Sequence, residues 1–254
     1  MNVAFFDSGI GGLTVLDAAM QLLPNESYIY FADTENVPYG TKSNEEIKKL
    51  VFRAVDFLTH FDLKALVLAC NTATAVVVND LRTMYDFPII GMEPAIKPAT
   101  SLSDKKVLVC ATERTLKEEK LDSLIENLNV ENQIEKCSLQ KLVTFAEQFD
   151  FKNPEVEIYL KQKFKNINWE DFDAIVLGCT HFLYFKPQLQ KMLPSHISIL
   201  DGNSGTIARL QKLITPNKSK SQTETRYFQS EKELSPLYFD NFLRFINEIT
   251  DYRK

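Results

Sequence analysis

The chain has 254 residues, of which 44% are hydrophobic and 25% are charged, so its composition is that of a folded globular protein. Its formal net charge of −5 argues against nucleic acid as a principal partner. No apolar stretch reaches membrane-spanning length, and the first residues lack the charged start and cleavage site of a signal peptide, so we expect a cytoplasmic protein without a membrane partner.

Predicted strands and amphipathic helices alternate through the first half of the chain. Ser43 and Glu46 have the spacing of a capping box, which predicts a helix that begins there and runs to His60. In chain order, the predicted elements are a strand at 3–6, a helix at 13–23, the capped helix, a strand that ends before Cys70, a helix near 73–85 and a strand at 87–91.

The second half repeats this alternation. The polar stretch 216–225 is predicted to be a loop, and an apolar stripe marks a last helix at 236–249 that should pack against the first half. The other predicted elements are a strand at 107–110, a helix at 115–128, a strand at 133–137, helices near 139–149 and 154–166, a strand that ends before Cys179 and a strand at 197–201.

Strand–helix alternation of this length predicts parallel sheets with right-handed crossovers. We therefore expect an α/β protein with two similar doubly wound domains, related by a pseudo-twofold axis, and an active site in the cleft between them. The first domain should comprise residues 1–93 and 207–254, and the second residues 94–206.

One short pattern occurs in both halves. Residues 66–72 read Leu-Val-Leu-Ala-Cys-Asn-Thr, and residues 175–181 read Ile-Val-Leu-Gly-Cys-Thr-His. Such apolar runs are typical of buried parallel strands, so Cys70 and Cys179 should emerge at carboxyl ends of strands, where open α/β sheets bind ligands. Two thiols on opposite sides of one carbon suit removal of a proton from one face and its return to the other, which inverts a stereocentre.

Side chains beside the two cysteines can support this chemistry. An unperturbed thiol has a pKa of about 8.5, and a following helix with donors such as Asn71, Thr72 and Thr180 should stabilise the thiolate. Asp7 and His181 also lie at predicted strand ends. Each can orient, or exchange a proton with, the thiol on its own side of the cleft.

The two other cysteines lack the polar pair that follows Cys70 and Cys179. Cys110 and Cys137 are therefore predicted to be small buried hydrophobic residues. The chain has no Cys-x-x-Cys pair, so neither a metal site nor a structural disulfide is expected.

Several motifs together resemble bacterial glutamate racemase, in the aspartate/glutamate racemase superfamily. The match runs in order from residue 3 to about residue 210. Its motifs are Asp7-Ser8-Gly9 with Gly11-Gly12, Val37-Pro38-Tyr39-Gly40, Cys70-Asn71-Thr72 and Gly178-Cys179-Thr180-His181.

The resemblance implies cofactor-independent interconversion of L- and D-glutamate, which supplies D-glutamate for peptidoglycan. It implies that Cys70 serves D-glutamate and Cys179 serves L-glutamate, that Asp7 and His181 assist them, and that no metal takes part. It further implies a homodimer and allows for regulation by a cell-wall precursor. The implied substrate-binding residues are Asp7, Ser8, Tyr39, Gly40, Asn71, Thr72, Thr115, Glu147, Thr180 and His181.

Two segments depart from the family pattern. The Phe-Pro-Leu that usually follows the second Cys-Thr-His reads Phe182-Leu183-Tyr184, and the late Asp-Ser-Gly turn reads Asp-Gly-Asn-Ser-Gly at 201–205. These departures affect the local loop shape and any regulatory pocket, and they leave the thiol pair in place.

Other functions stay open from the residues alone. A related enzyme could act on aspartate or another α-substituted carboxylate with the same thiols, and a binding protein could close a two-lobed cleft on a small acid. A thiol redox protein would need Cys70 and Cys179 within disulfide reach, about 7 Å between Cα atoms. The glycine-rich turn at 7–12, taken alone, could bind a phosphate at a helix N-terminus.

Overall fold

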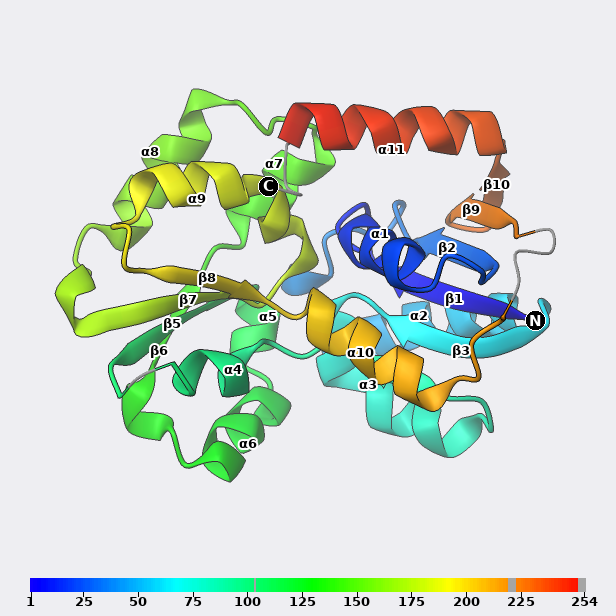
Figure 1. Ribbon diagram of the computed structural model, residues 1–254, viewed down its shortest axis with the longest axis horizontal. Helices are drawn as coiled ribbons and strands as arrows, with labels where there is room; N and C mark the ends of the chain where they lie inside the picture. Colours follow the sequence, from blue (N-terminus) through cyan, green and yellow to red (C-terminus); the bar gives the residue numbers. More distant parts are fainter. Residues whose placement is uncertain (103, 219–222, 251–254) are drawn as a thin grey trace.

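Two β-sheets lie at the centre of the structure, one in each of two lobes (Figure 1). The computed structural model describes residues 1–102, 104–218 and 223–250. The first lobe has a six-stranded sheet in the order β10-β9-β2-β1-β3-β4, and the second a four-stranded sheet in the order β6-β5-β7-β8. Among the described strand pairs, only β9 and β10 run antiparallel to each other.

The strands of the first sheet are β1 (Asn2–Asp7), β2 (Tyr28–Ala32), β3 (Leu63–Leu68), β4 (Ile89–Gly91), β9 (Thr225–Gln229) and β10 (Lys232–Leu234). Those of the second sheet are β5 (Lys106–Ala111), β6 (Ile134–Ser138), β7 (Phe172–Leu177) and β8 (Ser198–Asp201).

The helices of the first lobe are α1 (Leu13–Leu22), α2 (Asn44–Thr59), α3 (Asn71–Met84), α10 (Asn203–Leu213) and α11 (Pro236–Thr250), with a 3-10 turn η1 (Tyr39–Thr41). Those of the second lobe are α4 (Ile96–Thr100), α5 (Glu113–Leu116), α6 (Glu119–Leu128), α7 (Lys141–Glu147), α8 (Pro154–Phe164) and α9 (Lys186–Met192), with 3-10 turns η2 (Glu131–Gln133), η3 (Trp169–Asp171) and η4 (Thr180–Phe185).

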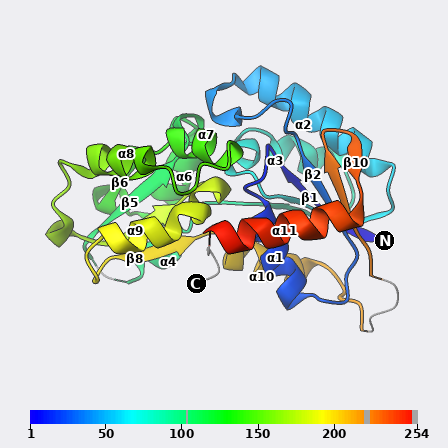
Figure 2. The ribbon, with the colours of Figure 1, turned by 90° about the horizontal axis from the view of Figure 1, so that it is seen from above.

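Helices cover both faces of each sheet. In the first lobe α2 and α3 lie on one face, and α1, α10 and α11 on the other (Figure 2). In the second lobe α4 and α6 cover one face, and α7, α8 and α9 the other. This double covering explains why the central strands are almost wholly apolar in sequence.

The central strand β1 shows this arrangement residue by residue. Its side chains from Val3 to Phe6 are fully buried. Val3 and Phe5 belong to the hydrophobic cluster on one face of the sheet, whereas Ala4 and Phe6 belong to the cluster on the other. Successive strand side chains point to opposite faces, so one short apolar run contributes to two separate cores.

The central strand pairs of the two sheets have the same irregularity. The pairing of β1 with β3 shifts register between Asn2 and Val3, and the pairing of β5 with β7 shifts between Lys106 and Val107. Each shift falls at the first two residues of its strand. This common detail supports the predicted internal repeat, and the predicted α/β fold with parallel sheets is confirmed.

Some elements differ from those predicted. The predicted helix at 115–128 is two helices, α5 and α6, because the Thr112 hydroxyl accepts from the Thr115 N–H and starts a short separate helix. The strands β2, β9 and β10 and the helices α4, α9 and α10 are missing from the sequence prediction. β2 reads Tyr-Ile-Tyr-Phe-Ala and is fully buried between β1 and β9. Its aromatic and β-branched residues favour a strand, and this pattern could have predicted β2 from the sequence.

The C-terminal helix α11 contacts both lobes. Its Phe239 stacks on Tyr227 of β9, with ring centroids 4.7 Å apart. Farther along, Phe242 and Phe245 pack edge-on against Phe149, which follows α7 in the second lobe. The helix was predicted to pack on the first half, and the structure adds a contact with the second (Figures 1 and 2).

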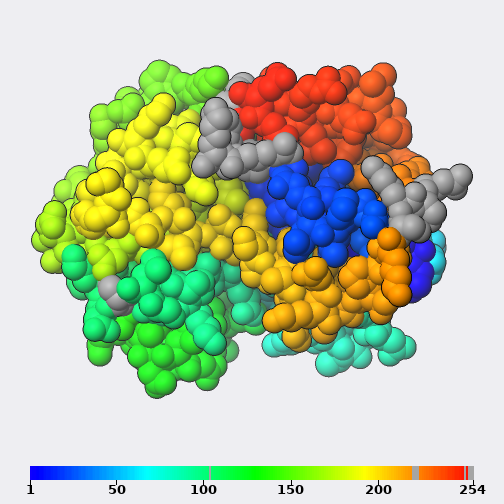
Figure 3. All heavy atoms as spheres, viewed as in Figure 1, coloured from blue at the N-terminus to red at the C-terminus, as the bar shows by residue number. Residues whose placement is uncertain are grey.

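The lobes touch along much of their common boundary. On the face drawn in Figure 3, atoms of α1 and α10 lie next to the second lobe. The predicted domain boundary between residues 206 and 207 falls inside α10, and the division of the chain at that point stays a prediction. None of the helices in the described ranges is long and apolar enough to cross a membrane.

Candidate active site

Both cysteines of the repeated motif lie just beyond a central strand. Cys70 comes two residues after β3 and is the N-cap of α3, where its sulfur accepts a hydrogen bond from the Ala73 N–H at 3.4 Å. Cys179 comes two residues after β7 and precedes η4. Each residue is only 6% exposed, and both are free thiols.

One small cavity between the lobes brings the two thiols together. Its volume is about 10 Å³, which is room for about one water molecule. The lining residues come from both halves of the chain and are Ser8, Tyr39, Gly40, Cys70, Asn71, Thr72, Thr112, Val143, Cys179, Thr180 and His181.

Three predicted site residues do not line the cavity but stand directly behind it. Asp7 accepts a hydrogen bond from the Thr180 hydroxyl at 3.2 Å. Glu147 contacts the His181 ring, and Thr115 bonds to the hydroxyls of Thr72 and Thr112.

The sequence missed two lining residues, Thr112 and Val143. Thr112 follows β5 as Ser8 follows β1, so the repeat itself was a usable signal for it. Val143 is an apolar residue on the predicted helix near 139–149, and nothing in its local sequence marks it as part of a site.

At the Cys179 side, three residues form a chain of contacts. The Cys179 sulfur lies 3.8 Å from Nδ1 of His181, and Nε2 of the same ring lies 2.5 Å from Oε1 of Glu147. Burial by itself lowers the pKa of His181, but its hydrogen bonds with Cys179 and Glu147 outweigh burial and raise that pKa well above 6.5. His181 is therefore held as an imidazolium that can donate a hydrogen bond to sulfur.

At the Cys70 side, the surroundings favour the neutral thiol. Cys70 lies 3.7 Å from the Ser8 hydroxyl. Burial and the nearby Asp7 carboxylate raise the pKa of Cys70 to about 12, and the bonds with Ala73 and Ser8 offset this only in part. Of the predicted stabilisation of a thiolate, the helix contributes through the Ala73 N–H, whereas the side chains of Asn71 and Thr72 bond to Met92 and to threonine hydroxyls instead. Desolvation outweighs this contribution at Cys70.

Asp7 is directed across the cleft. One of its oxygens accepts from the Gly9 N–H at 2.9 Å, and the other from Thr180 of the second lobe. Burial raises the pKa of Asp7 to about 6, against the opposing effects of the His181 charge and these hydrogen bonds. The carboxyl therefore titrates close to neutrality, as a proton-exchanging group requires.

Hydroxyl groups from both lobes converge beside the thiols. The Oγ1 atoms of Thr72, Thr112 and Thr115 lie 3.0–3.2 Å from one another. On the neighbouring wall, the Tyr39 hydroxyl donates to the Asp33 carboxylate at 2.6 Å. Buried hydroxyls that hydrogen-bond to one another can donate to a substrate carboxylate instead, so this group is suited to bind one.

The lobes also approach each other closely at Gly40. A Cβ atom there would lie 2.1 Å from Oε1 of Gln140 and 2.8 Å from Cβ of Thr112. Any larger residue at this position would push the second lobe away, so this glycine permits the closed arrangement.

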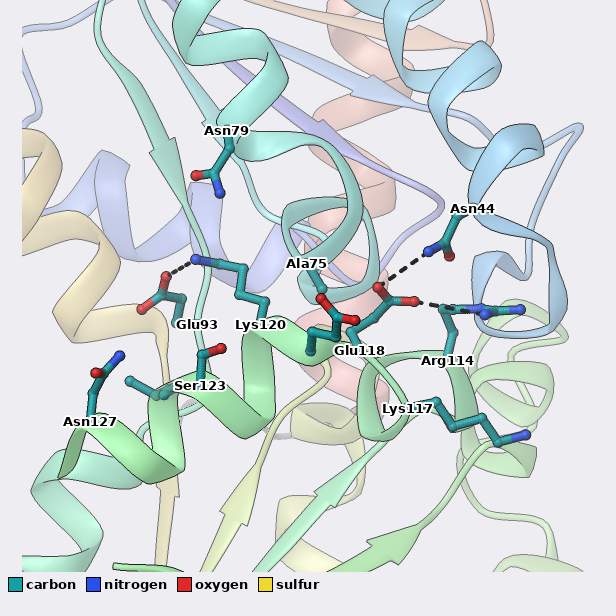
Figure 4. Close-up of a pocket in the computed structure, with 12 residues that line it drawn as sticks. Asn44, Ala75, Asn79, Glu93, Arg114, Lys117, Glu118, Lys120, Ser123 and Asn127 are labelled. Atoms are coloured by element: carbon teal, nitrogen blue, oxygen red, sulfur yellow. Dashed lines mark hydrogen bonds and ion pairs between the residues drawn. The ribbon is translucent and has the colours of Figure 1, made fainter. Parts of the chain in front are cut away.

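A separate groove opens on another side of the boundary between the lobes (Figure 4). It has a volume of about 830 Å³, and none of the predicted site residues lines it. Four of its charged side chains form two ion pairs: Lys120 with Glu93 at 2.7 Å, and Arg114 with Glu118 at 3.7 Å. Within the described ranges, no group of three or more His, Cys, Asp and Glu side chains is arranged to hold a metal ion.

A model of the Asp/Glu/Hydantoin racemase family matches residues 14–210 of the chain. The chain belongs to this family. The match includes both thiol motifs, and the resemblance predicted from them is confirmed. As a member of a racemase family, the protein is an isomerase.

Individual relatives agree with this assignment. A curated glutamate racemase from Halothermothrix orenii is 48% identical over 88% of this chain and 89% of its own length. The crystal structure of a glutamate racemase isoform from Bacillus anthracis has a TM-score of 0.85 at 29% identity, over 97% of this chain and 94% of that one. An Escherichia coli glutamate racemase, solved with L-glutamate and the activator UDP-MurNAc-Ala, has a TM-score of 0.81 at 31% identity, over 98% of this chain and 95% of that one.

Proposed function

We propose that this protein interconverts L- and D-glutamate by proton transfer between the substrate α-carbon and two cysteines, Cys70 and Cys179. The observation that carries the proposal is that thiols from the two lobes line one buried cavity. The choice of glutamate is supported by the curated relatives, which are glutamate racemases, and by the L-glutamate complex of the E. coli enzyme.

In this mechanism the α-carbon lies between the two sulfur atoms. One sulfur, as thiolate, removes the α-proton from its face, the α-carbon carries the electron pair that is left, and the other sulfur, as thiol, donates its proton to the opposite face. One C–H bond breaks and one forms, so atoms and charge balance without a cofactor. The two thiols then hold exchanged protonation states, and the next turnover can run in reverse.

The two sulfurs have different surroundings. Cys70 is held as a thiol and is a proton donor to the α-carbon. Cys179 faces the imidazolium of His181, which can donate a hydrogen bond to its sulfur. If Cys179 serves L-glutamate, as the resemblance implies, the thiol of Cys70 is the proton donor that conversion of the L form to the D form requires.

The closed cavity requires the lobes to separate before substrate enters. An amino acid is several times larger than one water molecule, and the cavity has room for about one. Reclosure would then place the hydroxyls of Ser8, Thr72 and Thr180 against the substrate carboxylates and exclude bulk water, which strengthens every electrostatic contact in the site.

The product has a defined use in this proposal. D-glutamate supplies peptidoglycan synthesis, and a cell-wall precursor regulates the enzyme. The second part is supported by the E. coli structure, whose activator is UDP-MurNAc-Ala. A homodimer and a cytoplasmic location belong to the same proposal.

Solvent-isotope exchange tests the proposal directly. Each glutamate enantiomer is incubated with the protein in D₂O, and optical rotation is followed together with deuterium at the α-carbon. We expect inversion with deuterium incorporation from either enantiomer, and a loss of inversion of at least about 10³-fold in Cys70→Ser and in Cys179→Ser. Full two-way activity in either variant would refute the paired-thiol mechanism.

The same assay separates the alternatives. Rapid exchange on aspartate with none on glutamate would assign the site to the shorter acid. A binding protein would retain ligand affinity in both serine variants and show no exchange with any acid. Cys137→Ser is the matched control, because that cysteine does not line the cavity.

A further inference from the structure

A tyrosine of the second lobe bonds to the glycine-rich turn of the first. Tyr184 lies in η4, in the segment where the sequence departs from the family pattern, and its side chain is fully buried. Its hydroxyl donates to the carbonyl oxygen of Ile10 at 2.7 Å. Ile10 belongs to the turn between β1 and α1, so this hydrogen bond joins the lobes.

The backbone of Ile10 is held a second time from the second lobe. The Ile10 N–H donates to Oε1 of Glu147 at 2.9 Å, and that oxygen also contacts His181. Both polar atoms of the Ile10 backbone therefore bond to side chains across the cleft. By contrast, the neighbouring Gly9 carbonyl accepts from Tyr30 of the first lobe at 2.8 Å.

The turn lies directly against the imidazole. A Cβ atom at Gly11 would be 2.4 Å from Nδ1 of His181 and 2.4 Å from Oγ1 of Thr180. The backbone at Gly11 thus forms one wall of the space that His181 occupies, and a displacement of the turn must displace the ring. Nδ1 is also the atom that faces the sulfur of Cys179.

We propose that Tyr184 is a positioning residue: its hydrogen bond closes the second lobe onto the Ile10 peptide and thereby aligns His181 with Cys179. The role in catalysis rests on the proposed function, whereas the role in closure does not. Tyr184, Thr180 and His181 lie on one short buried segment, so closure and alignment occur together.

The test uses Tyr184→Phe in the full-length protein, with Tyr28→Phe as the matched control. Tyr28 is also buried, and its hydroxyl donates to the carbonyls of Leu23 and Ala19 within the first lobe. Both variants lose one buried hydroxyl, so a general loss of stability would be similar in the two.

Closure is measured without substrate, by the rate of alkylation with iodoacetamide, resolved by peptide mass spectrometry. In Tyr184→Phe we expect Cys70 and Cys179 to react about tenfold faster, the factor that one hydrogen bond of ordinary net strength supplies. Cys137, which is half-buried and outside the cavity, should react at the same rate in all three proteins. Equal rates at Cys70 and Cys179 in the two variants would overturn the proposal.

Alignment is measured by turnover. We expect Tyr184→Phe to lower kcat/KM about tenfold. The thiol that removes the α-proton can return only that proton, so deuterium from the solvent enters the product and not the recovered substrate. Alignment at Cys179 is therefore read from the α-deuterium isotope effect on kcat/KM, which should rise for L-glutamate and fall for D-glutamate, because proton transfer at Cys179 becomes more rate-limiting than transfer at Cys70. Unchanged isotope effects would also overturn the proposal. If the wild-type protein fails to racemise glutamate, the proposed function fails, and the alkylation rates still decide the closing role of Tyr184.

Discussion

Cys70 and Cys179 follow strands that occupy equivalent places in their sheets, but the segments after them differ. Cys70 caps a helix of 14 residues, where its sulfur accepts from a backbone N–H and its thiol donates to the Ser8 hydroxyl. Cys179 enters a 3-10 turn that brings His181 within 3.8 Å of its sulfur. The repeated strand delivers both thiols to the cleft, and the segment that follows sets which groups contact each sulfur.

The largest effect is expected from removing the group found at only one of the two sides. His181→Gln should lower kcat/KM by about 10²- to 10⁴-fold, the usual range for a positioned acid–base group. Because the two enantiomers have equal free energy in water, kcat/KM must fall equally in both directions. The asymmetry should instead appear in the α-deuterium isotope effect on kcat/KM, which should rise for L-glutamate and fall for D-glutamate. Equal changes for the two enantiomers would mean that His181 serves both cysteines alike.

A smaller effect is expected from the residue that holds this ring. Glu147→Gln should lower kcat/KM by about tenfold, since one charge-assisted hydrogen bond is lost. The carboxylate raises the pKa of His181, so the variant should lose activity at a lower pH than the wild type as pH rises. Glu135→Gln, on a surface pair with Lys106, is the control. A pH profile that coincides with that of the wild type would contradict the assignment.

Asp7 allows a test by stability. Its pKa rises on folding from 3.8 to about 6, so the folded protein binds more protons between these values and loses stability as pH rises through them. Asp7→Asn removes that loss and should raise the free energy of unfolding by up to about 3 kcal/mol at pH 7.5, with little difference at pH 4. Urea unfolding at the two pH values measures it.

The control for Asp7→Asn is Asp56→Asn, on the exposed face of α2. This change should alter stability by less than about 0.5 kcal/mol at either pH. If Asp7→Asn destabilised the protein at pH 7.5, its hydrogen bonds with Gly9 and Thr180 would outweigh the cost of burying the charge.

The smallest effect is expected at the cysteines outside the cleft. Cys110 and Cys137 are register partners on β5 and β6, and neither lines the cavity. Cys137→Ala should leave kcat/KM within about twofold and change the free energy of unfolding by about 1 kcal/mol or less. A tenfold loss of activity would mean that the site extends to this strand pair.

Local sequence predicted the parts of the site that lie at strand ends. The motifs around Cys70 and Cys179 are short and contiguous, so the buried strand and the polar residues after it could be read together. The direction of Asp7 could not, because its hydrogen bond to Thr180 joins residues 173 positions apart. Which lobe supplies the hydrogen-bond partner of this carboxylate depends on how the two lobes close. No local sequence pattern contains that information.

The same reason explains the missed elements. β2 has a clear apolar run, but its place between β1 and β9 depends on a strand from the far end of the chain. The division of the predicted helix at 115–128 depends on a single hydroxyl cap at Thr112. Val143 faces the cavity only because α7 packs at the mouth of the cleft.

The position of α11 has a consequence for turnover. The helix stacks on Tyr227 in one lobe and packs against Phe149 in the other, so parting the lobes to admit or release an amino acid must break one set of ring contacts. Each aromatic contact of this kind contributes on the order of 1 kcal/mol. If the lobes part as proposed, the rate of product escape depends on aromatic residues of α11 that do not line the cavity.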